Sequence, residues 1–256
     1  MVRRKILDKQ SVDLSGHKNL MDLSPLNGFT KMEKLDLVDT GVTDLSPIAN
    51  CHQLKVLRLS RSTIKDLSPI ANLSNLIELQ ISQTEVDDIS ALKELNNLEW
   101  LRADNCHFSD ISALKGKNKL SRLEVSNCPI IEFSPLSDLA GLVLLSLHYT
   151  SFSDCGLLVN NQNIANLSLA RTEIKQIDDL ASLKNIWRIS VQGTRVLDYS
   201  PLLELPNLSE LSVGEYLSKE SYPNSVSIPI TELNLNWQTI SDEENIREFI
   251  LKTANS

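Results

Sequence analysis

Apolar residues recur along this chain at intervals of 22 residues. The repeating unit is clearest at Leu57, Leu59, Ile64, Leu67 and Ile70, with polar residues at most positions between them. Its first two positions recur as pairs: Leu35/Leu37, Leu79/Ile81, Leu101/Ala103, Leu123/Val125, Leu145/Leu147, Leu167/Leu169, Ile189/Val191, Leu211/Val213 and Leu233/Leu235. These ten copies stay in phase without an inserted or deleted residue, so the pattern predicts a solenoid of stacked repeats.

Each copy is predicted to form one short β-strand and a tight return turn. Apolar residues that alternate with polar ones lie on one face of a strand, and neighbouring strands stack about 4.8 Å apart. Several return segments begin with Ser-Pro, at residues 46–47, 68–69, 134–135 and 200–201. We expect a short 3-10 or α-helical turn there, with Ser as its cap and Pro at the first helical position.

The start of the array differs from the repeats that follow it. Residues 1–17 fit the period loosely, with Val12 and Leu14 as the remnant of a strand. An end repeat must cover core that no neighbour covers, so we interpret this segment as an N-terminal cap. Residues 18–240 then hold about ten repeats.

The end of the chain is predicted to be a capping helix over residues 241–256. Ser241 is followed three residues later by Glu244, which is the pattern of a capping box. The face that this helix would bury carries Ile246, Phe249 and Ile250. With no linker rich in Pro, Gly or Ser, we expect one domain over residues 1–256.

The pattern Leu-x-Leu-x-x-Thr-x-Ile-x-Asp-Leu-Ser-Pro-Leu resembles the internalin-type leucine-rich repeats of bacteria. It is less closely similar to the leucine-rich regulatory subunits of protein phosphatase 1. The resemblance covers roughly residues 18–242. It implies an α/β repeat fold: a right-handed, curved solenoid with a parallel β-sheet on the concave face, short 3-10 or α turns on the convex face, and a C-terminal capping helix. It also implies recognition of proteins by the concave face.

One column of the repeat departs from that family. Many leucine-rich repeats carry Asn there, whereas this chain carries small hydroxyl or thiol side chains. A hydroxyl can also satisfy backbone groups in a stacked turn, so we expect the same fold. The column reads Thr40, Ser62, Thr84, Cys106, Cys128, Thr150, Thr172 and Thr194.

The net charge of −8 comes largely from a second column, which precedes the return turns. A carboxylate there can accept backbone N–H groups at the start of a short helical turn. We therefore interpret the acidity as architectural and not as a sign of a basic partner. The column reads Asp22, Asp44, Asp66, Asp88, Asp110, Glu132, Asp154, Asp198 and Asp242.

The composition favours a cytoplasmic protein, and the resemblance to internalins implies a bacterial one. No stretch reaches the roughly 18 apolar residues of a membrane span, so no membrane partner is expected. The basic start, Arg3 to Lys5, is followed by no apolar run, and we expect no export signal. The four cysteines take positions where the repeat needs a small buried side chain, which fits free thiols in a reducing compartment: Cys51, Cys106, Cys128 and Cys155.

Residue types that carry catalysis do not gather in this sequence. The four histidines are dispersed, and the chain has no Gly-rich phosphate loop, HExxH, GxSxG or CxxC motif. We expect no enzymatic activity, no cofactor, no metal site and no small-molecule substrate. A nucleic-acid partner is not expected either, because basic residues are interleaved with acids and the isoelectric point is near 5.1.

The outward side chains of the sheet are the remaining candidates for a site. Trp, Tyr and Arg are enriched at interface hot spots, and the packing of the repeat does not require an outward Trp. Trp100, Arg102, Arg122, His148 and Tyr149 fall within three successive repeats and are predicted to form the centre of a protein-binding patch. The full set of predicted partner-binding residues is Arg58, Gln80, Trp100, Arg102, Asp104, Arg122, Glu124, His148, Tyr149, Arg171 and Arg188.

Charge on this face also bears on the partner. Six arginines outnumber three acids, which indicates a locally positive centre and a partner with an acidic ridge. The arginines are Arg58, Arg61, Arg102, Arg122, Arg171 and Arg188, and the acids are Glu78, Asp104 and Glu124.

The predicted function is a non-enzymatic scaffold that binds a protein on its concave sheet, with a possible role as an inhibitor or immunity protein. Two alternatives stay open: a regulatory or structural subunit of a phosphatase or other complex, and a secreted internalin-like virulence factor whose export signal has been removed. Two return segments are irregular, at 155–163 and 216–232. The second is a candidate additional binding loop.

Overall fold

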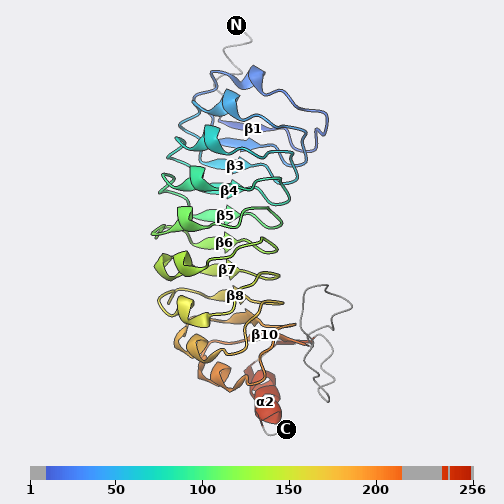
Figure 1. Ribbon diagram of the computed structural model, residues 1–256, viewed down its shortest axis with the longest axis vertical. Coiled ribbons are helices and arrows are strands. Elements are labelled where there is room, and N and C mark those ends of the chain that lie inside the picture. Colours follow the sequence, from blue (N-terminus) through green and yellow to red (C-terminus); the bar gives the residue numbers. More distant parts are fainter. Residues whose placement is uncertain (1–9, 215–237, 242, 255–256) are drawn as a thin grey trace. The chain divides into compact units, whose positions relative to one another are not determined.

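The computed structural model describes residues 10–214, 238–241 and 243–254. The chain divides into two compact units, residues 1–142 and 143–256, called here the first and the second unit. Each is built from the same element, a strand of three or four residues followed by a 3-10 turn (Figure 1). The candidate loop at 216–232 lies outside the described residues.

The first unit contains a parallel sheet whose strands follow one another in sequence order. Leu57 pairs with Leu79 and Leu79 with Leu101, so the sequence period is the register of the sheet. The strands are β1 (Ser11–Asp13), β2 (Lys34–Asp36), β3 (Val56–Arg58), β4 (Glu78–Gln80), β5 (Trp100–Arg102) and β6 (Arg122–Glu124). The turns are η1 (Ser24–Leu26), η2 (Ser46–Ile48), η3 (Ser68–Ile70), η4 (Ser90–Leu92), η5 (Ser112–Leu114) and η6 (Ser134–Asp138).

Strand β1 confirms the predicted strand remnant in the N-terminal segment. Val12 pairs with Leu35, which is 23 residues away instead of 22. The extra residue explains why this segment fits the period loosely.

The second unit repeats the same parallel arrangement and then ends it. Strands β7 (Leu144–Ser146), β8 (Asn166–Ser168), β9 (Arg188–Ser190) and β10 (Glu210–Val213) pair in parallel. Its turns are η7 (Cys155–Leu158), η8 (Asp178–Ser182) and η9 (Ser200–Glu204). Turn η7 forms although its sequence lacks Ser-Pro, because Asp154 accepts the backbone N–H of Gly156 at 2.9 Å.

The last strand corrects the expected continuation of the period. In the 22-residue period Ile240 falls in the same column as Ile64, outside the expected strand, but it lies in β11 (Gln238–Ser241), which pairs with β10 in antiparallel order. The expected tenth strand at 233–235 lies outside the described residues. An antiparallel strand offers no register for another repeat, so β11 ends the parallel array.

The predicted C-terminal helix is present as α2 (Glu243–Ala254). Ile246 and Ile250 are buried, and Phe249 lies 6.1 Å from the ring of Tyr199. The helix contacts turn η9 and strand β10, where it covers apolar side chains that no further repeat would bury.

The core is formed by the apolar columns that the sequence predicted. Leu57, Leu79, Leu101 and Leu123 have no exposed surface, nor do Leu145, Leu167 and Ile189 in the second unit. The hydroxyl column is buried beside them, and its threonines satisfy backbone carbonyls, whereas the Ser62 hydroxyl has no hydrogen-bond partner among the described residues. Thr84 Oγ1 donates to the carbonyl of Ile81 at 2.7 Å, and Thr172 Oγ1 donates to that of Leu169 at 2.6 Å. This confirms the structural role expected for that column.

The return turns correct one detail of the prediction. The acidic residue caps the turn, and the serine that follows is the donor. Asp66 accepts the backbone N–H of Ser68 at 2.7 Å and its hydroxyl at 2.8 Å. Pro therefore occupies the second residue of η3, as it does in η2. The architectural reading of the acidic column is confirmed at Asp22, Asp44, Asp66, Asp88, Asp110, Glu132, Asp154 and Asp198.

Candidate functional site

The first and third side chains of each strand point away from the core and form the outward face of each unit. In the first unit this face begins with an ionic ladder. Arg58 Nε donates to Glu78 Oε1 at 2.7 Å, and its Nη1 lies 3.6 Å from Asp36 Oδ2. Gln80 Nε2 also donates to Glu78, at 2.8 Å. The hydrogen bond that Arg58 donates to Glu78, followed by the negative charges of Glu78 and Asp36, raises the pKa of Arg58 above its ordinary value. These side chains are held in fixed positions on the sheet.

Trp100 is the centre of a second cluster on the same unit. Its indole Nε1 donates to Glu124 Oε1 at 3.0 Å, and Arg122 Cζ lies 5.3 Å from the centre of its ring. Arg102 Nε lies 3.4 Å from carboxylate oxygens of both Asp104 and Glu124. The cation–π contact and the hydrogen bond orient the indole without burying it in the core. This places five of the predicted site residues in one cluster.

These ion pairs correct the expectation that the centre of the outward face is positively charged, because acids pair with several of its arginines. Arg58 and Arg102 each contact two acids within the first unit, and Arg188 Nε pairs with Glu210 at 3.1 Å in the second unit. The count of outward charges from the sequence omits Asp36 and does not consider ion pairs between arginines and acids. Arg61 and Arg122 form no ion pair with a carboxylate in the described part of the chain.

The second unit holds a different cluster at its strand exits. The rings of His148 and Tyr149 lie 5.5 Å apart, and Arg171 Cζ lies 4.8 Å from the centre of the Tyr149 ring. The stem of Arg171 passes over Gly193, where an added Cβ would lie 2.8 Å from its Cγ. Gly193 therefore leaves room for the arginine that stacks on Tyr149.

The predicted patch falls into these two clusters. Trp100, Arg102 and Arg122 belong to the first unit, and His148 and Tyr149 belong to the second. Each cluster is brought together within its own unit. That all five make one site stays a prediction.

Sequence reasoning missed a column of left-handed residues directly after the strands. Their φ angles lie between 53° and 67°, where side chains other than Gly, Asn and Asp are uncommon. Asn105, Asn127 and Gly193 were the signal that could have revealed it. The column reads Asp39, Arg61, Gln83, Asn105, Asn127, Tyr149, Arg171 and Gly193.

The four cysteines are buried free thiols, as predicted. Burial raises the pKa of Cys128 to about 12, and burial followed by nearby carboxylates raises that of Cys155 to about 12. Cys106 Sγ donates to the carbonyl of Ile81 at 3.1 Å, in the place of the threonine hydroxyls of other repeats. A protonated, enclosed thiol is a packing group and a poor nucleophile.

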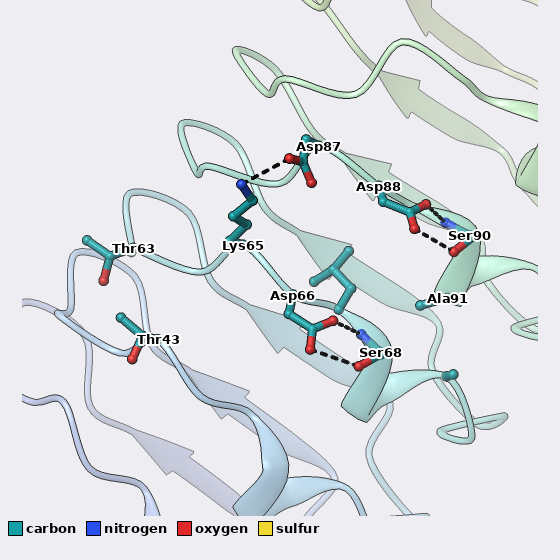
Figure 2. A pocket seen from close by; sticks show the side chains of 11 residues that line it. Thr43, Thr63, Lys65, Asp66, Ser68, Asp87, Asp88, Ser90 and Ala91 are labelled. Carbon is teal, nitrogen blue, oxygen red and sulfur yellow. Dashed lines mark hydrogen bonds and ion pairs between the residues drawn. The ribbon is translucent and has the colours of Figure 1, made fainter.

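A hollow of about 740 Å³ in the first unit lies among the return turns and not on the sheet. Figure 2 shows residues that line it, among them Thr43, Thr63 and two members of the acidic column, Asp66 and Asp88. Asp66 and Asp88 bind the serines of their own turns, and Lys65 pairs with Asp87 at 3.1 Å. Its charged groups are thus engaged in the fold itself.

The described residues give no independent sign of a metal site or a membrane span. They contain no group of three His, Cys, Asp or Glu side chains placed to hold a metal ion. No helix among them has the length and hydrophobicity needed to cross a bilayer.

Comparison with known proteins identifies solved structures with the same architecture. Neither the protein-family models nor the curated proteins match the sequence. Among solved structures, internalin InlF of Listeria monocytogenes is 26% identical over 80% of this chain and 61% of its own, with a TM-score of 0.77. Internalin C2 of the same organism is 28% identical over 74% of this chain and 83% of its own, with a TM-score of 0.66. This chain is similar to these internalins and shares their leucine-rich-repeat fold.

A third solved structure has the same fold as this chain. A leucine-rich-repeat protein of Leptospira interrogans is 17% identical over 80% of this chain and 60% of its own, with a TM-score of 0.68. The present chain thus spans about three fifths of the InlF and Leptospira chains. The weaker similarity to phosphatase regulatory subunits stays a prediction.

Proposed function

We propose that this leucine-rich-repeat protein is a binding scaffold that captures a protein partner on the outward face of its parallel sheet. The observation that carries this proposal is Trp100. It lies outward on β5, Glu124 and Arg122 fix its orientation, and its removal would leave the core intact. A large aromatic side chain held rigidly on an outward face contributes to binding at little entropic cost.

The fold supports the same conclusion. Repeat proteins of this kind present long, preformed surfaces and typically serve binding instead of catalysis. One similar structure, with a TM-score of 0.69 and 14% identity, is the leucine-rich-repeat ectodomain of an Arabidopsis thaliana receptor kinase in complex with Casparian strip integrity factor 2. At that identity the likeness concerns the fold, so this complex supports the proposal only as an example of a leucine-rich-repeat protein with a bound partner.

As a finer role, we propose that the protein inhibits its partner by covering part of that partner's surface. A rigid scaffold without flexible catalytic loops can block access to a surface without reacting with it. The experiment is to assay the captured partner's own activity with and without an excess of this protein. If the partner's activity were unchanged, the proposed binding role would stand and the proposed inhibitory role would be refuted.

We further propose a cytoplasmic location, supported by four buried cysteines that remain free thiols. Cell fractionation followed by immunoblotting tests this. Recovery in the culture medium or cell envelope would contradict it and favour the secreted alternative.

Photo-crosslinking can test the binding face directly. Replacing Gln80 on β4 by benzoylphenylalanine should crosslink the partner from native extract, and the same probe at Lys65 on a return turn should not. The Trp100→Ala/Arg122→Ala double variant should lose at least 100-fold in affinity for the purified partner, since hot-spot truncations cost about 2 kcal/mol or more each. Its thermal unfolding should stay close to that of wild type.

A matched control removes one exposed apolar side chain and one cation elsewhere on the first unit. Ile131 is 80% exposed and Lys65 lies on a return turn, so Ile131→Ala/Lys65→Ala should bind like wild type. Crosslinking from Lys65 but not from Gln80 would move the site to the turns and refute the proposed face.

A further inference from the structure

A small recess opens on the outward face of the first unit, beside the Trp100 cluster. Its volume is about 260 Å³, and four successive repeats contribute to it, from Val38 after β2 to Arg102 in β5. Ser60 and Ser82 line its small-residue side together with Val38, and the long side chains around it are Arg61, Gln80, Gln83 and Arg102. The recess is too small for most metabolites, whose pockets measure roughly 300–1,000 Å³.

The polar groups of this recess are mostly donors, and several are uncommitted. Arg61 is exposed and forms no ion pair with a carboxylate in the described chain, and the Ser60 hydroxyl and Gln83 amide have no hydrogen-bond partner there. Arg102 is 48% exposed and touches two carboxylates through Nε at 3.4 Å. Because a guanidinium carries five N–H donors, it retains donors for a further acceptor.

The acids near the recess are already engaged. Asp39 precedes Arg61 in the left-handed column and pairs with Lys18 at 3.6 Å. Asp104 accepts the hydroxyl of Ser82 at 3.4 Å and the backbone N–H of Ser126 at 3.0 Å. Neither neutralises Arg61.

The backbone at Arg61 shows that its side chain is not chosen by local conformation. Arg61 has φ of 61°, a conformation that the fold imposes on the corresponding residues of neighbouring repeats, and that Asn105 and Asn127 adopt more easily. The Arg61 side chain makes no hydrogen bond or ion pair in the described chain. Its guanidinium is therefore available to a partner.

We propose that this recess binds a carboxylate side chain, Asp or Glu, of the protein partner. The two guanidinium groups supply paired donors that match a carboxylate, and the serine hydroxyl and glutamine amide add neutral donors. This inference rests on the proposed function, because the carboxylate belongs to the protein that docks on the same outward face.

Titration followed by NMR tests it without knowing the partner. The probe is acetyl-Glu-Glu-Glu-Glu-amide, and its control is the same peptide with Gln in place of Glu. The Glu peptide should shift the signals of Ser60, Arg61, Gln83 and Arg102 in a saturable way, and the Gln peptide should not. Arg61→Asn should weaken this binding at least tenfold while its unfolding temperature stays equal or rises, because asparagine tolerates the backbone conformation.

The controls decide between specific and general effects. Lys175→Asn removes one exposed cation from a return segment of the second unit and should leave the titration unchanged. Shifts that are absent, equal for both peptides, or unaltered in Arg61→Asn would each overturn the proposal. Tighter binding of inorganic phosphate to the same signals would replace the carboxylate by a general anion.

The two proposals can fail separately. If partner capture depends on Trp100 and Arg122 but the peptide does not bind at Arg61, the proposed scaffold function is supported and the proposed carboxylate site is refuted. If the peptide binds at Arg61 but no partner crosslinks from β4, the recess remains an anion site and the proposed function falls.

Discussion

The outward faces of the two units differ although their inward faces are alike. In the first unit, the third strand residues are charged or large: Asp36, Arg58, Gln80, Arg102 and Glu124. In the second unit, the equivalent residues are all serines: Ser146, Ser168, Ser190 and Ser212. The residue before each of them is a buried Leu or Ile in both units. Core packing thus fixes one face of the repeat and leaves the other free for recognition.

The largest expected effect tests whether the buried inward faces of the two units contribute equally to stability. Leu101→Ala and Leu167→Ala should each lower the free energy of unfolding by about 2–5 kcal/mol, because both leucines are fully buried and truncation leaves a cavity. Urea denaturation measures this. A loss below 1 kcal/mol in one unit would show that the two cores are not equivalent.

The next effect tests the difference between the outward faces. Arg58→Ala should cost about 1–3 kcal/mol, because Asp36 and Glu78, each 14% exposed, lose their shared partner. Ser168→Ala in the second unit should change stability by less than about 0.5 kcal/mol. Equal losses in urea denaturation would mean that the ionic ladder does not distinguish the two faces.

A smaller effect is the pH dependence of stability that comes from a buried lysine, in a column of the repeat where the two units also differ. Lys117 replaces a core leucine of the first unit, is 4% exposed, and donates to the carbonyls of Lys93 and Leu95 at 3.0 and 3.2 Å. Burial lowers its pKa below the ordinary 10.5. The unfolded chain therefore binds more protons than the folded chain between the lowered pKa and pH 10.5, so this residue makes stability rise with pH across that window.

Denaturation of wild type and Lys117→Met between pH 8 and 11 isolates this contribution. The difference in unfolding free energy should shift in favour of wild type as pH rises. Cys128 and Tyr199, whose pKa values are raised, act in the opposite direction but equally in both proteins. If the difference in unfolding free energy between the two proteins did not change with pH, the lowered pKa of Lys117 would be contradicted.

The smallest effect concerns the left-handed column. Gln83→Asn in the first unit should gain about 0.5–1 kcal/mol, because Asn adopts positive φ more easily and Gln83 has no side-chain contact to lose. Tyr149→Asn should gain less, since the ring contacts with His148 and Arg171 are lost. Thermal unfolding measures both. Two equal gains would indicate that those ring contacts contribute nothing to stability.

The sequence predicted the repeat well because inward packing repeats residue by residue. The strand register, the buried columns, the thiol positions and helix α2 all follow from apolar spacing, which is a local and periodic property. The termination by antiparallel β11 was not predictable from that spacing. Ile240 continues the apolar period, yet pairing with Leu211 in β10 depends on the path of the intervening chain.

The sequence could predict which side chains lie outward and close together, but not how they pair; that they bind a partner stays a prediction. Trp100 and Arg122 were selected because they point outward, and they do form one cluster. Their charge environment was misjudged, because acids from neighbouring repeats pair with Arg58 and Arg102 across the strands. The role of Arg61 also required the structure, since its positive φ and lack of an ion pair are not visible in the sequence.

The sequence by itself determined the solenoid, its period and the side chains available on the outward face. Each of these depends on interactions between residues at fixed separations of a few positions or of one repeat. Only the tertiary structure decided which outward charges are already paired and which remain available. That distinction depends on distances of 2.7–3.6 Å between side chains of neighbouring repeats. Side-chain direction sets such distances, and residue spacing alone cannot specify it.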